Sequence, residues 1–392
     1  MAKFVFAVPP FEGHVNPTLS VGKELLNRGN EAAWISVDKQ LEAVIPQGGK
    51  FFYISHDYDE QSFRNFKKEY TQISYQQGFG NLRMLYEKGL IPLNQYMLDG
   101  ITHYLSEFHP DIVIYDHQLF AGAVAAFLLH IPYVASVTAQ ASIRAFEAIP
   151  ILHKWEDEQV VHFQQRNGVT GDKRLDDSAS MILVYSSKLF FGNNKLPSFY
   201  QFVGPVIKDR PTPYAFDWDR FESMKHRKCV LVSIGTTFDD KEMQTFFQKV
   251  IEALRDENLT VVMVSNPELF SEIPDNFIIQ NRIPQLQLLP YMQLVICHAG
   301  QNTVSETLLH GIPLIVLPIA DDQSQVANDV VLSGAGIRMR FKRFKPENLK
   351  NTINEVLNNE IYKKNAEKIQ SSFKEAGSVE KAADLLEGLF NI

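Results

Sequence analysis

Two side chains with catalytic potential follow apolar segments in the first half of this sequence. His14 comes shortly after the segment Lys3 to Val8, and Asp116 comes directly after DIVIY, residues 111 to 115. A histidine titrates at about pH 6.5, so it can take a proton from a hydroxyl group, and a carboxylate on its second ring nitrogen would fix its tautomer. We therefore expect His14 to be a general base with Asp116 as its partner.

Both residues also have a purely local interpretation. His14 can be a loop histidine at the start of a helix, and Asp116 can cap the helix that follows it. His117 is a second candidate base, but neighbouring side chains of an extended chain point to opposite sides, so we expect it to point away. Whether His14 pairs with Asp116 is a question for the structure.

A second group of polar side chains lies in the sequence CHAGQNTVSE, residues 297 to 306. An apolar segment ends where this stretch begins, Gly300 turns the chain, and a helix is expected from about Asn302. The free amides of a helix N-terminus favour an anion, to which His298 can donate, and Glu306 lies one turn further along the same face. A carboxylate there can accept hydrogen bonds from ribose hydroxyls. The stretch therefore favours a nucleotide site.

Two further turns follow apolar segments in the same half of the chain. VSIGTTF ends in Gly235, Thr236, Thr237 and a phenylalanine, and the glycine turn offers amides and hydroxyls to a phosphate. A tight structural turn is an equally good interpretation. LPIADDQ places Asp322 and Gln323 after another strand, where a carboxylate and an amide suit sugar hydroxyls, or where the acidic pair caps a helix.

Composition and charge exclude several classes of protein. No metal site is expected, because His298 and His310 lack a ligand spacing and Cys297 belongs to a strand. A net charge of −8 argues against nucleic acid or an anionic membrane as a partner. Two cysteines in apolar segments predict free thiols in a reducing compartment. No segment is typical of a signal sequence or reaches the roughly 18 apolar residues of a membrane span, so we expect a soluble, cytoplasmic protein.

Parallel sheets must position these residues, because short apolar segments alternate with helical patterns along the chain. Asn16 is expected to cap the first helix, with Pro17 at its first position and its end near Arg28. Such sheets bind ligands beyond the carboxyl ends of their strands. The expected fold is α/β with two Rossmann-like domains. The N-terminal domain is expected over residues 1–205 and the C-terminal domain over 227–375, with a Pro-rich linker over 206–226 between them. A C-terminal helix over 376–392 is expected to pack back on the N-terminal domain.

The stretch from Arg282 to Gln323 resembles the donor-binding signature of the inverting UDP-sugar glycosyltransferases of family 1. The matching pieces are RIPQ, LLP, HAGQNTVSE, GIPLIVLP and DQ, together with GHVNP, YD, FVGP and SIGT elsewhere in the chain. The sequence is most similar to the bacterial macrolide and zeaxanthin glucosyltransferase-like group. The resemblance covers the whole chain in outline. It implies the GT-B fold, in which two Rossmann-like domains face each other across a cleft, the first holding the acceptor and the second the UDP-sugar.

The resemblance also implies roles for matching positions. His14 looks like the general base and Asp116 like its carboxylate partner, while Glu306 resembles the ribose-binding glutamate, with Gln285 near the ribose. The backbone of Ile283 would meet uracil. The diphosphate would be held by His298, Asn302, Thr303 and Thr236. The hexose would be contacted by Asp322 and Gln323. The whole donor-binding set implied is Gly13, Ser233, Gly235, Thr236, Thr237, Arg282, Ile283, Gln285, His298, Gly300, Gln301, Asn302, Thr303, Glu306, Asp322 and Gln323.

Two positions depart from the pattern of the plant members. Arg282 stands where an aromatic side chain usually stacks on uracil, and a guanidinium plane can also stack. Gln301 replaces a tryptophan next to the sugar. Both positions adjoin the donor, so the departures concern how this chain holds its nucleotide sugar.

The chemistry implied by the resemblance is an inverting hexosyl transfer from a UDP-sugar to a hydroxyl of an apolar small molecule, such as a polyketide, phenolic, terpenoid or lipid. Gln323 favours glucose, so UDP-glucose is the expected co-substrate, with no metal and no cofactor. Two alternatives stay open: a nucleotide-sugar epimerase of the same fold, and a non-catalytic protein that binds a nucleotide sugar or a lipophile. The segments expected to line the acceptor pocket, residues 55–105 and 140–165, carry no motif.

Overall fold

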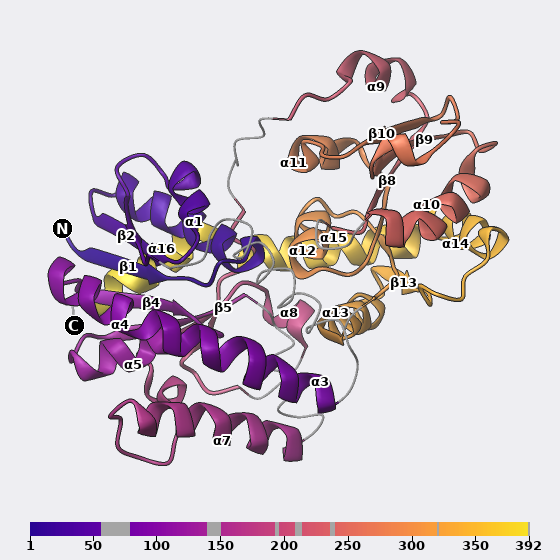
Figure 1. Ribbon diagram of the computed structural model, residues 1–392. Coiled ribbons are helices and arrows are strands. Elements are labelled where there is room, and N and C mark those ends of the chain that lie inside the picture. Colours follow the sequence, from indigo (N-terminus) through magenta and orange to yellow (C-terminus); the bar gives the residue numbers. More distant parts are fainter. Residues whose placement is uncertain are drawn as a thin grey trace. The chain divides into compact units, whose positions relative to one another are not determined.

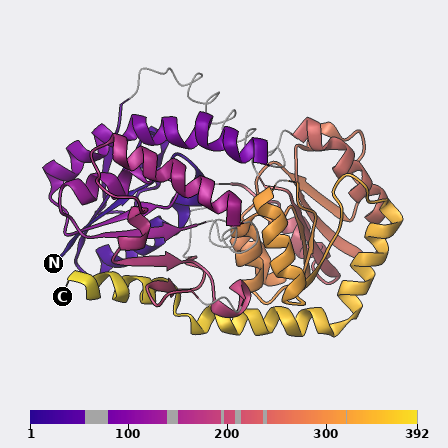
Figure 2. The same ribbon diagram turned by 90° about the horizontal axis from the view of Figure 1, so that it is seen from below.

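The computed structural model describes residues 1–55, 79–138, 150–192, 196–207, 214–235, 240–319 and 321–390. The chain forms two compact units. The first contains residues 1–187, 193–208 and 375–392, and the second contains residues 188–192 and 209–374. Each unit is built around a parallel sheet covered by helices, as Figures 1 and 2 show.

The sheet of the first unit has the strand order β3-β2-β1-β4-β5-β6-β7, and its neighbouring strands are parallel. The strands β1, β4 and β5 are neighbours, and their side chains are almost completely buried because helices cover both faces. Their carboxyl ends therefore lie along one edge. The strand bounds are β1 Lys3–Ala7, β2 Glu31–Ser36, β3 Lys50–Tyr53, β4 Ile112–Asp116, β5 Tyr133–Val137, β6 Met181–Val184 and β7 Tyr200–Phe202.

The helix that follows β1 approaches the sheet closely. A Cβ atom at Gly22 would lie 2.2 Å from the ring of Trp34, so only glycine lets the helix pack against β2 at this point. The indole of Trp34 donates to the Thr18 hydroxyl at 3.1 Å. The helices of this unit are α1 Glu12–Asn27, η1 Lys39–Val44, α3 Phe79–Met84, η2 Leu85–Leu90, α4 Ile91–Phe108, α5 Ala121–Leu128, α7 Pro150–Arg166, η3 Leu175–Ser178 and α16 Ser378–Phe390.

The C-terminal helix α16 belongs to the first unit, although the residues before it belong to the second. It contacts α1, beside which it lies in Figure 1, and Leu386 is buried in the same core as β1. Arg28, directly after α1, forms ion pairs with Asp384 at 2.7 Å and Glu387 at 2.8 Å. The last helix thus completes the N-terminal core.

The second unit repeats the architecture with the strand order β10-β9-β8-β11-β12-β13, again parallel throughout. The carboxyl ends of β8 and β11 are adjacent, because Ser233 pairs with Cys297. The elements are α8 Lys188–Phe191, α9 Trp218–Met224, β8 Lys228–Ser233, α10 Asp240–Leu254, β9 Leu259–Val264, η4 Pro267–Leu269, β10 Phe277–Gln280, α11 Gln285–Leu288, η5 Leu289–Tyr291, β11 Leu294–Cys297, α12 Gln301–Leu309, β12 Leu314–Val316, α13 Asp321–Leu332, β13 Gly336–Arg338, α14 Pro346–Asn358 and α15 Glu360–Glu375.

The first helix begins earlier than the sequence indicates. α1 starts at Glu12, directly after the extended residue Phe11, so Asn16 is not its cap and Pro17 lies inside it. The extra turn buries Val15, which is 1% exposed and belongs to the core of the first unit. Burial of an apolar side chain stabilises the turn more than a polar cap at Asn16 would. His14 consequently lies in the first turn of a helix and not in a loop.

The expected linker over residues 206–226 is wrong in its second half. Residues 218–224 form α9, whose Phe221 is 0% exposed in the core of the second unit. The carboxylate of Asp217 caps this helix by accepting from the Arg220 amide at 3.0 Å. The proline-rich composition around residue 211 and the few apolar positions of this helix concealed it. Another difference is α8, which lies within the N-terminal half of the sequence but belongs to the second unit.

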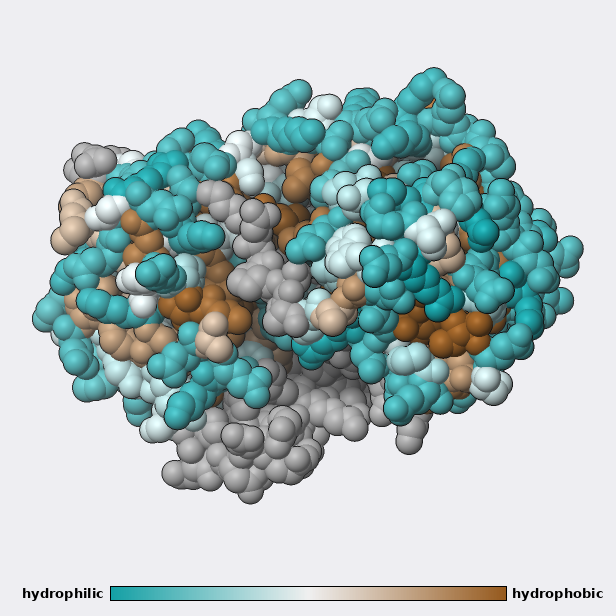
Figure 3. All heavy atoms as spheres, turned by 90° about the horizontal axis from the view of Figure 1, so that it is seen from above, coloured by the Kyte–Doolittle hydropathy of each residue, from teal (hydrophilic) through white to brown (hydrophobic). Residues whose placement is uncertain are grey.

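Figure 3 shows one face on which apolar residues form small, separate patches among hydrophilic side chains. Among the described helices, none combines the length and the apolarity that crossing a bilayer requires.

Candidate active site

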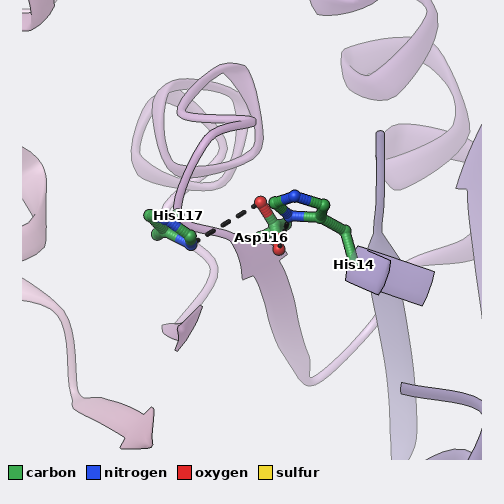
Figure 4. A group of neighbouring side chains, drawn as sticks. All are labelled: His14, Asp116 and His117. Carbon is green, nitrogen blue, oxygen red and sulfur yellow. Dashed lines mark hydrogen bonds and ion pairs between the residues drawn. The ribbon is translucent and has the colours of Figure 1, made fainter. Parts of the chain in front are cut away.

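His14 and Asp116 form a hydrogen-bonded pair in the first unit. The Nδ1 atom of His14 lies 2.9 Å from Oδ2 of Asp116 (Figure 4). The Asp116 side chain is fully buried, and that of His14 is 17% exposed. A buried carboxylate on Nδ1 orients the imidazole and leaves Nε2 as its second functional nitrogen. The structure therefore brings together the two residues that the sequence singled out for acid–base chemistry.

Thr138 is a third member of this site that the sequence analysis missed. Its hydroxyl donates to Asp116 Oδ2 at 2.9 Å and lies 2.9 Å from Nδ1 of His14. Thr138 directly follows β5, just as Asp116 ends β4, and the two strands are neighbours. The sequence could have indicated Thr138 by its position directly after a strand, but a single threonine at such a position belongs to no recognisable motif.

Adjacent strands and one buried asparagine position the pair. His14 follows β1 and Asp116 ends β4, so the parallel pairing of these strands brings residues 102 positions apart into contact. Asn94 of α4 holds the turn after Asp116, because its amide donates to the Gln118 carbonyl at 2.8 Å and its oxygen accepts from the Ala121 amide at 2.7 Å. The turn is thereby fixed relative to the helix layer.

The surroundings of Asp116 favour its charged form. Burial raises the pKa of this carboxyl, but the nearby His14 and His117, with hydrogen bonds from His14 and the Gln118 amide, lower the pKa below its usual value. The carboxylate is therefore available near neutral pH to stabilise a protonated imidazole.

His117 does not point away from His14, contrary to the expectation from sequence. The two rings are stacked with centroids 6.0 Å apart, and Nδ1 of His117 lies 3.7 Å from Oδ1 of Asp116 (Figure 4). Alternation of side chains holds only within a strand, and β4 ends at Asp116, where the chain turns. Burial lowers the pKa of His117, and this effect outweighs the opposite influence of Asp116.

The second unit brings together two polar residues expected near a ribose. The amide of Gln285, at the start of α11, donates to Oε2 of Glu306 in α12 at 2.6 Å. Glu306 is only 4% exposed, although it is charged in isolation. Buried carboxylates require hydrogen-bond donors, and Gln285 provides one.

His298 fills the space between two glycine turns. A Cβ atom added at Gly235 would lie 2.8 Å from the His298 ring, and one added at Gly300 would lie 2.6 Å from it. Both positions therefore require glycine. Burial lowers the pKa of His298 to about 4, partly offset by a hydrogen bond to the Ser233 carbonyl. The imidazole is thus neutral near pH 7, and it makes a hydrogen bond with the Ser233 carbonyl. Donation to a diphosphate stays a prediction.

Arg282 is held by an aromatic side chain. Its guanidinium lies 5.2 Å from the ring centroid of Tyr214 and donates to the tyrosine hydroxyl at 2.7 Å. Ile283 beside it is buried with 8% exposure, so its side chain belongs to the core. Arg282 is exposed, and a flat ring can stack on its guanidinium plane.

The remaining candidates divide into described and undescribed residues. Gly13 is exposed in the first turn of α1, and Asn302 and Thr303 lie half-buried in the first turn of α12. Gln301 donates to Ser305 at 3.0 Å, and Gln323 accepts from the Ile319 amide at 2.9 Å. Outside the described residues lie Thr236, Thr237, the side chain of Asp322 and parts of the expected acceptor segments, residues 56–78 and 140–149.

Comparison with known proteins finds a family that matches more than half of the chain. Residues 146–378, more than half of the chain, match the family described as UDP-glucoronosyl and UDP-glucosyl transferase. The UDP-glucosyltransferase YojK of Bacillus subtilis is 29% identical over 98% of this chain and 96% of its own length. A zeaxanthin glucosyltransferase of Pseudescherichia vulneris is 23% identical over 99% of this chain and 98% of its own length.

The fold is that of solved GT-B glycosyltransferases. The structure of CalG4, the calicheamicin glycosyltransferase, superposes on this chain with a TM-score of 0.77 at 20% identity, covering 99% of this chain and 98% of CalG4. Two parallel-sheet, Rossmann-like units are common to both.

Proposed function

The chain belongs to the UDP-glucoronosyl and UDP-glucosyl transferase family, and from this premise we propose that it is an inverting transferase that moves glucose from UDP-glucose to a hydroxyl group of an apolar small molecule. The sequence resemblance to family 1 and the prediction of a glycosyltransferase enzyme are confirmed by the family match and by the relatives. Zeaxanthin and calicheamicin, named for two of these relatives, support a small-molecule acceptor here.

His14 is proposed as the general base. Its Nδ1 atom bonds to Asp116 at 2.9 Å, and this bond is the single observation that carries the proposal. Nε2 takes the proton of the acceptor hydroxyl while the oxygen forms a bond to the anomeric carbon and the bond from that carbon to the UDP oxygen breaks. UDP leaves with the electron pair, and Asp116 stabilises the imidazolium formed. Attack from the side opposite UDP inverts the anomeric centre.

Glu306 and Gln285 are proposed as the ribose-binding pair. The Gln285 amide fixes the Glu306 carboxylate at 2.6 Å, and a fixed carboxylate can accept hydrogen bonds from ribose hydroxyls. This chemistry favours a ribonucleotide over a 2′-deoxynucleotide, because a deoxyribose offers one hydroxyl fewer. UDP is the donor nucleotide that we propose on this ground.

Arg282 is proposed as the platform for uracil. Tyr214 contacts its guanidinium by a cation–π contact and a hydrogen bond of 2.7 Å, which restrict the side chain before binding. The half-buried residues at the start of α12, with the glycine turns around His298, are proposed to hold the diphosphate. Glucose as the hexose rests on the family resemblance at Gln323. The absence of a metal or cofactor requirement and the cytoplasmic location stay predictions.

Two other functions would leave a different pattern of residues. An epimerase acts on the nucleotide sugar alone and has no need of a base for an acceptor, whereas His14 and Asp116 form an ordered pair. A non-catalytic binding protein has no need to keep a buried carboxylate against an imidazole that is 17% exposed, since burial of a charge costs free energy. The ordered pair therefore favours the transferase.

One experiment separates the three functions. The purified chain is incubated with UDP-glucose alone and then with UDP-glucose and a panel of phenolic, polyketide and terpenoid alcohols. We expect UDP release and a product heavier by one hexose, seen by mass spectrometry, only when an acceptor is present, and a β-linkage by NMR. A changed sugar without an acceptor would indicate an epimerase, and binding of UDP-glucose without any product would indicate a binding protein.

A further inference from the structure

Three potential metal ligands meet at the end of β4. His14, Asp116 and His117 each offer one ligand atom, and these atoms lie within 4.8 Å of one another. Figure 4 shows the two imidazoles on either side of the carboxylate. Within the part of the chain that the structure describes, this is the group of histidine and carboxylate side chains with metal-binding geometry.

His117 provides an independent indication of a ligand. Its side chain is 10% exposed, yet neither of its buried ring nitrogens makes a hydrogen bond of normal geometry among the described residues. The Ser136 backbone raises the pKa of His117 only as a minor influence beside burial. The nearest carboxylate oxygen, on Asp116, lies 3.7 Å from Nδ1, which is too far for a hydrogen bond. A buried nitrogen without a partner is unfavourable, because it has lost its hydrogen bonds to water. The family role of the His14–Asp116 pair does not account for this residue.

We propose that His14, Asp116 and His117 form a binding site for a transition-metal ion of the Zn²⁺ type, and that occupation of this site stops glycosyl transfer. The site itself stands on the geometry of the three side chains. Its effect on turnover rests on the proposed function, in which His14 is the base.

The donor set selects this class of ion. Two imidazole nitrogens and one carboxylate oxygen are typical ligands of Zn²⁺, Co²⁺, Ni²⁺ and Cu²⁺, whereas Mg²⁺ and Ca²⁺ require oxygen ligands. Bonds of about 2.1 Å in a tetrahedral arrangement separate ligand atoms by about 3.4 Å. The distance of 2.9 Å from His14 Nδ1 to Asp116 Oδ2 and that of 3.7 Å from His117 Nδ1 to Asp116 Oδ1 lie on either side of this value. A small rotation of the His117 ring, which makes no hydrogen bond of normal geometry among the described residues, would complete the set.

A bound ion would remove the basicity of His14. Coordination uses the lone pair of one ring nitrogen, and the positive charge disfavours protonation of the other. The ion would also take the Asp116 carboxylate, which otherwise stabilises the imidazolium. Three protein ligands leave a fourth position for water or for the Thr138 hydroxyl, which lies 2.9 Å from both Nδ1 of His14 and Oδ2 of Asp116.

Binding is measured first, independently of catalysis. The wild-type chain, freed of metal by a chelator, is titrated with CoCl₂ while the visible absorption of tetrahedral Co²⁺ is followed, and with ZnCl₂ in a calorimeter. We expect one ion per chain. His117→Ala is expected to weaken binding at least about tenfold, since loss of an outer-shell partner alone costs 10–100-fold. His103→Ala is the matched control, because His103 is an exposed histidine of the same unit, with 71% exposure.

Inhibition is measured second, with the acceptor found in the panel. We expect ZnCl₂ to stop turnover of wild type and His103→Ala, EDTA to restore it, and His117→Ala to keep its turnover in ZnCl₂. His117→Gln, checked by circular dichroism, replaces the alanine variant if that one does not fold. Equal Zn²⁺ binding in wild type and the His117 variant, or no binding at one ion per chain, overturns the proposal. A chain that binds Zn²⁺ but glycosylates nothing retains the metal site and refutes the proposed function.

Discussion

The Thr138 hydroxyl donates to Oδ2 of Asp116 at 2.9 Å and lies equally far from Nδ1 of His14. The same carboxylate oxygen accepts from His14, so one oxygen atom joins an imidazole and a hydroxyl from two different strand ends. Thr138 is 7% exposed, and its hydroxyl is shielded from water that might replace it. This contact fixes Asp116 relative to His14 and makes Thr138 a positioning residue for the proposed base.

Thr138→Val keeps the shape of this side chain and removes its hydroxyl. We expect kcat to fall about tenfold, corresponding to one hydrogen bond to a charged group, because Asp116 loses a donor and His14 is held less firmly. Calorimetric affinity for UDP should be unchanged, since the proposed nucleotide site lies in the second unit. Thr138→Ser restores the hydroxyl and should restore most of kcat. Equal losses in the serine and valine variants would contradict the positioning role.

His14→Ala removes the proposed base and should lower kcat by about 10²–10⁴-fold. Asp116→Asn keeps the shape of the carboxylate but can hold the wrong imidazole tautomer, so it should also reduce kcat strongly. Steady-state assays of UDP release measure both, and UDP affinity serves as a check that each variant folds. Turnover of His14→Ala at the wild-type rate would refute the assignment of the base. His103→Ala, in the same unit, should behave as wild type.

Much of this site follows from the sequence, and particular residues explain where inference stopped. Position after a strand and a chemically apt side chain were enough to find His14 and Asp116, because parallel pairing of β1 with β4 brings those strand ends together. Thr138 has the same placement, but threonine is common and its hydroxyl has no specific signature. The expectation that His117 points away was wrong, because the alternation of side chains within a strand was applied to a residue beyond the end of β4.

Helix boundaries and the linker show a second limit of sequence inference. The Asn16–Pro17 pair is typical of a helix start, but burial of Val15 favours a start at Glu12. A proline-rich composition concealed α9, because the seven residues of this helix hold few apolar positions, of which Phe221 and Met224 are buried. In each case tertiary packing outweighed a local preference.

Glu306→Gln preserves volume and removes the charge proposed to accept from the ribose. We expect KM for UDP-glucose to rise about tenfold, with a smaller change in kcat, because the interaction exists before and during the reaction. The Gln285 amide would also lose a charged acceptor at 2.6 Å. Gln287→Ala, on the exposed side of α11, is the matched control. An unchanged KM in the Glu306 variant would exclude it from nucleotide binding.

Arg282→Ala should weaken UDP binding by about fivefold, corresponding to about 1 kcal/mol of stacking. Arg282→Trp should bind UDP at least as well as wild type, because an indole offers a flat ring at the same position. Tyr214→Phe keeps the ring under the guanidinium and loses the hydrogen bond of 2.7 Å, so its effect should be smaller than that of the alanine. Calorimetry with UDP measures all three, and equal affinity of the alanine variant and wild type would refute the platform.

Glu156 predicts a pH dependence of stability. Burial raises the pKa of this α7 carboxyl from 4.5 to about 7, against the opposite influence of Arg174 and a hydrogen bond from Tyr86. Between these two pH values the folded state holds a proton that the unfolded chain has lost. The stabilisation is therefore complete below about pH 4.5 and is lost as pH rises through about 7.

Glu156→Gln imitates the protonated carboxyl at every pH and can still accept from Tyr86. We expect the variant to unfold at the wild-type temperature at pH 5. At pH 8.5 it should be more stable by about 1–3 kcal/mol, which raises the midpoint of the first unit by several degrees. Thermal unfolding followed by circular dichroism at both pH values measures this difference. Glu158→Gln, on the exposed side of the same helix, should show no such dependence, and identical curves for the two variants would refute the assignment.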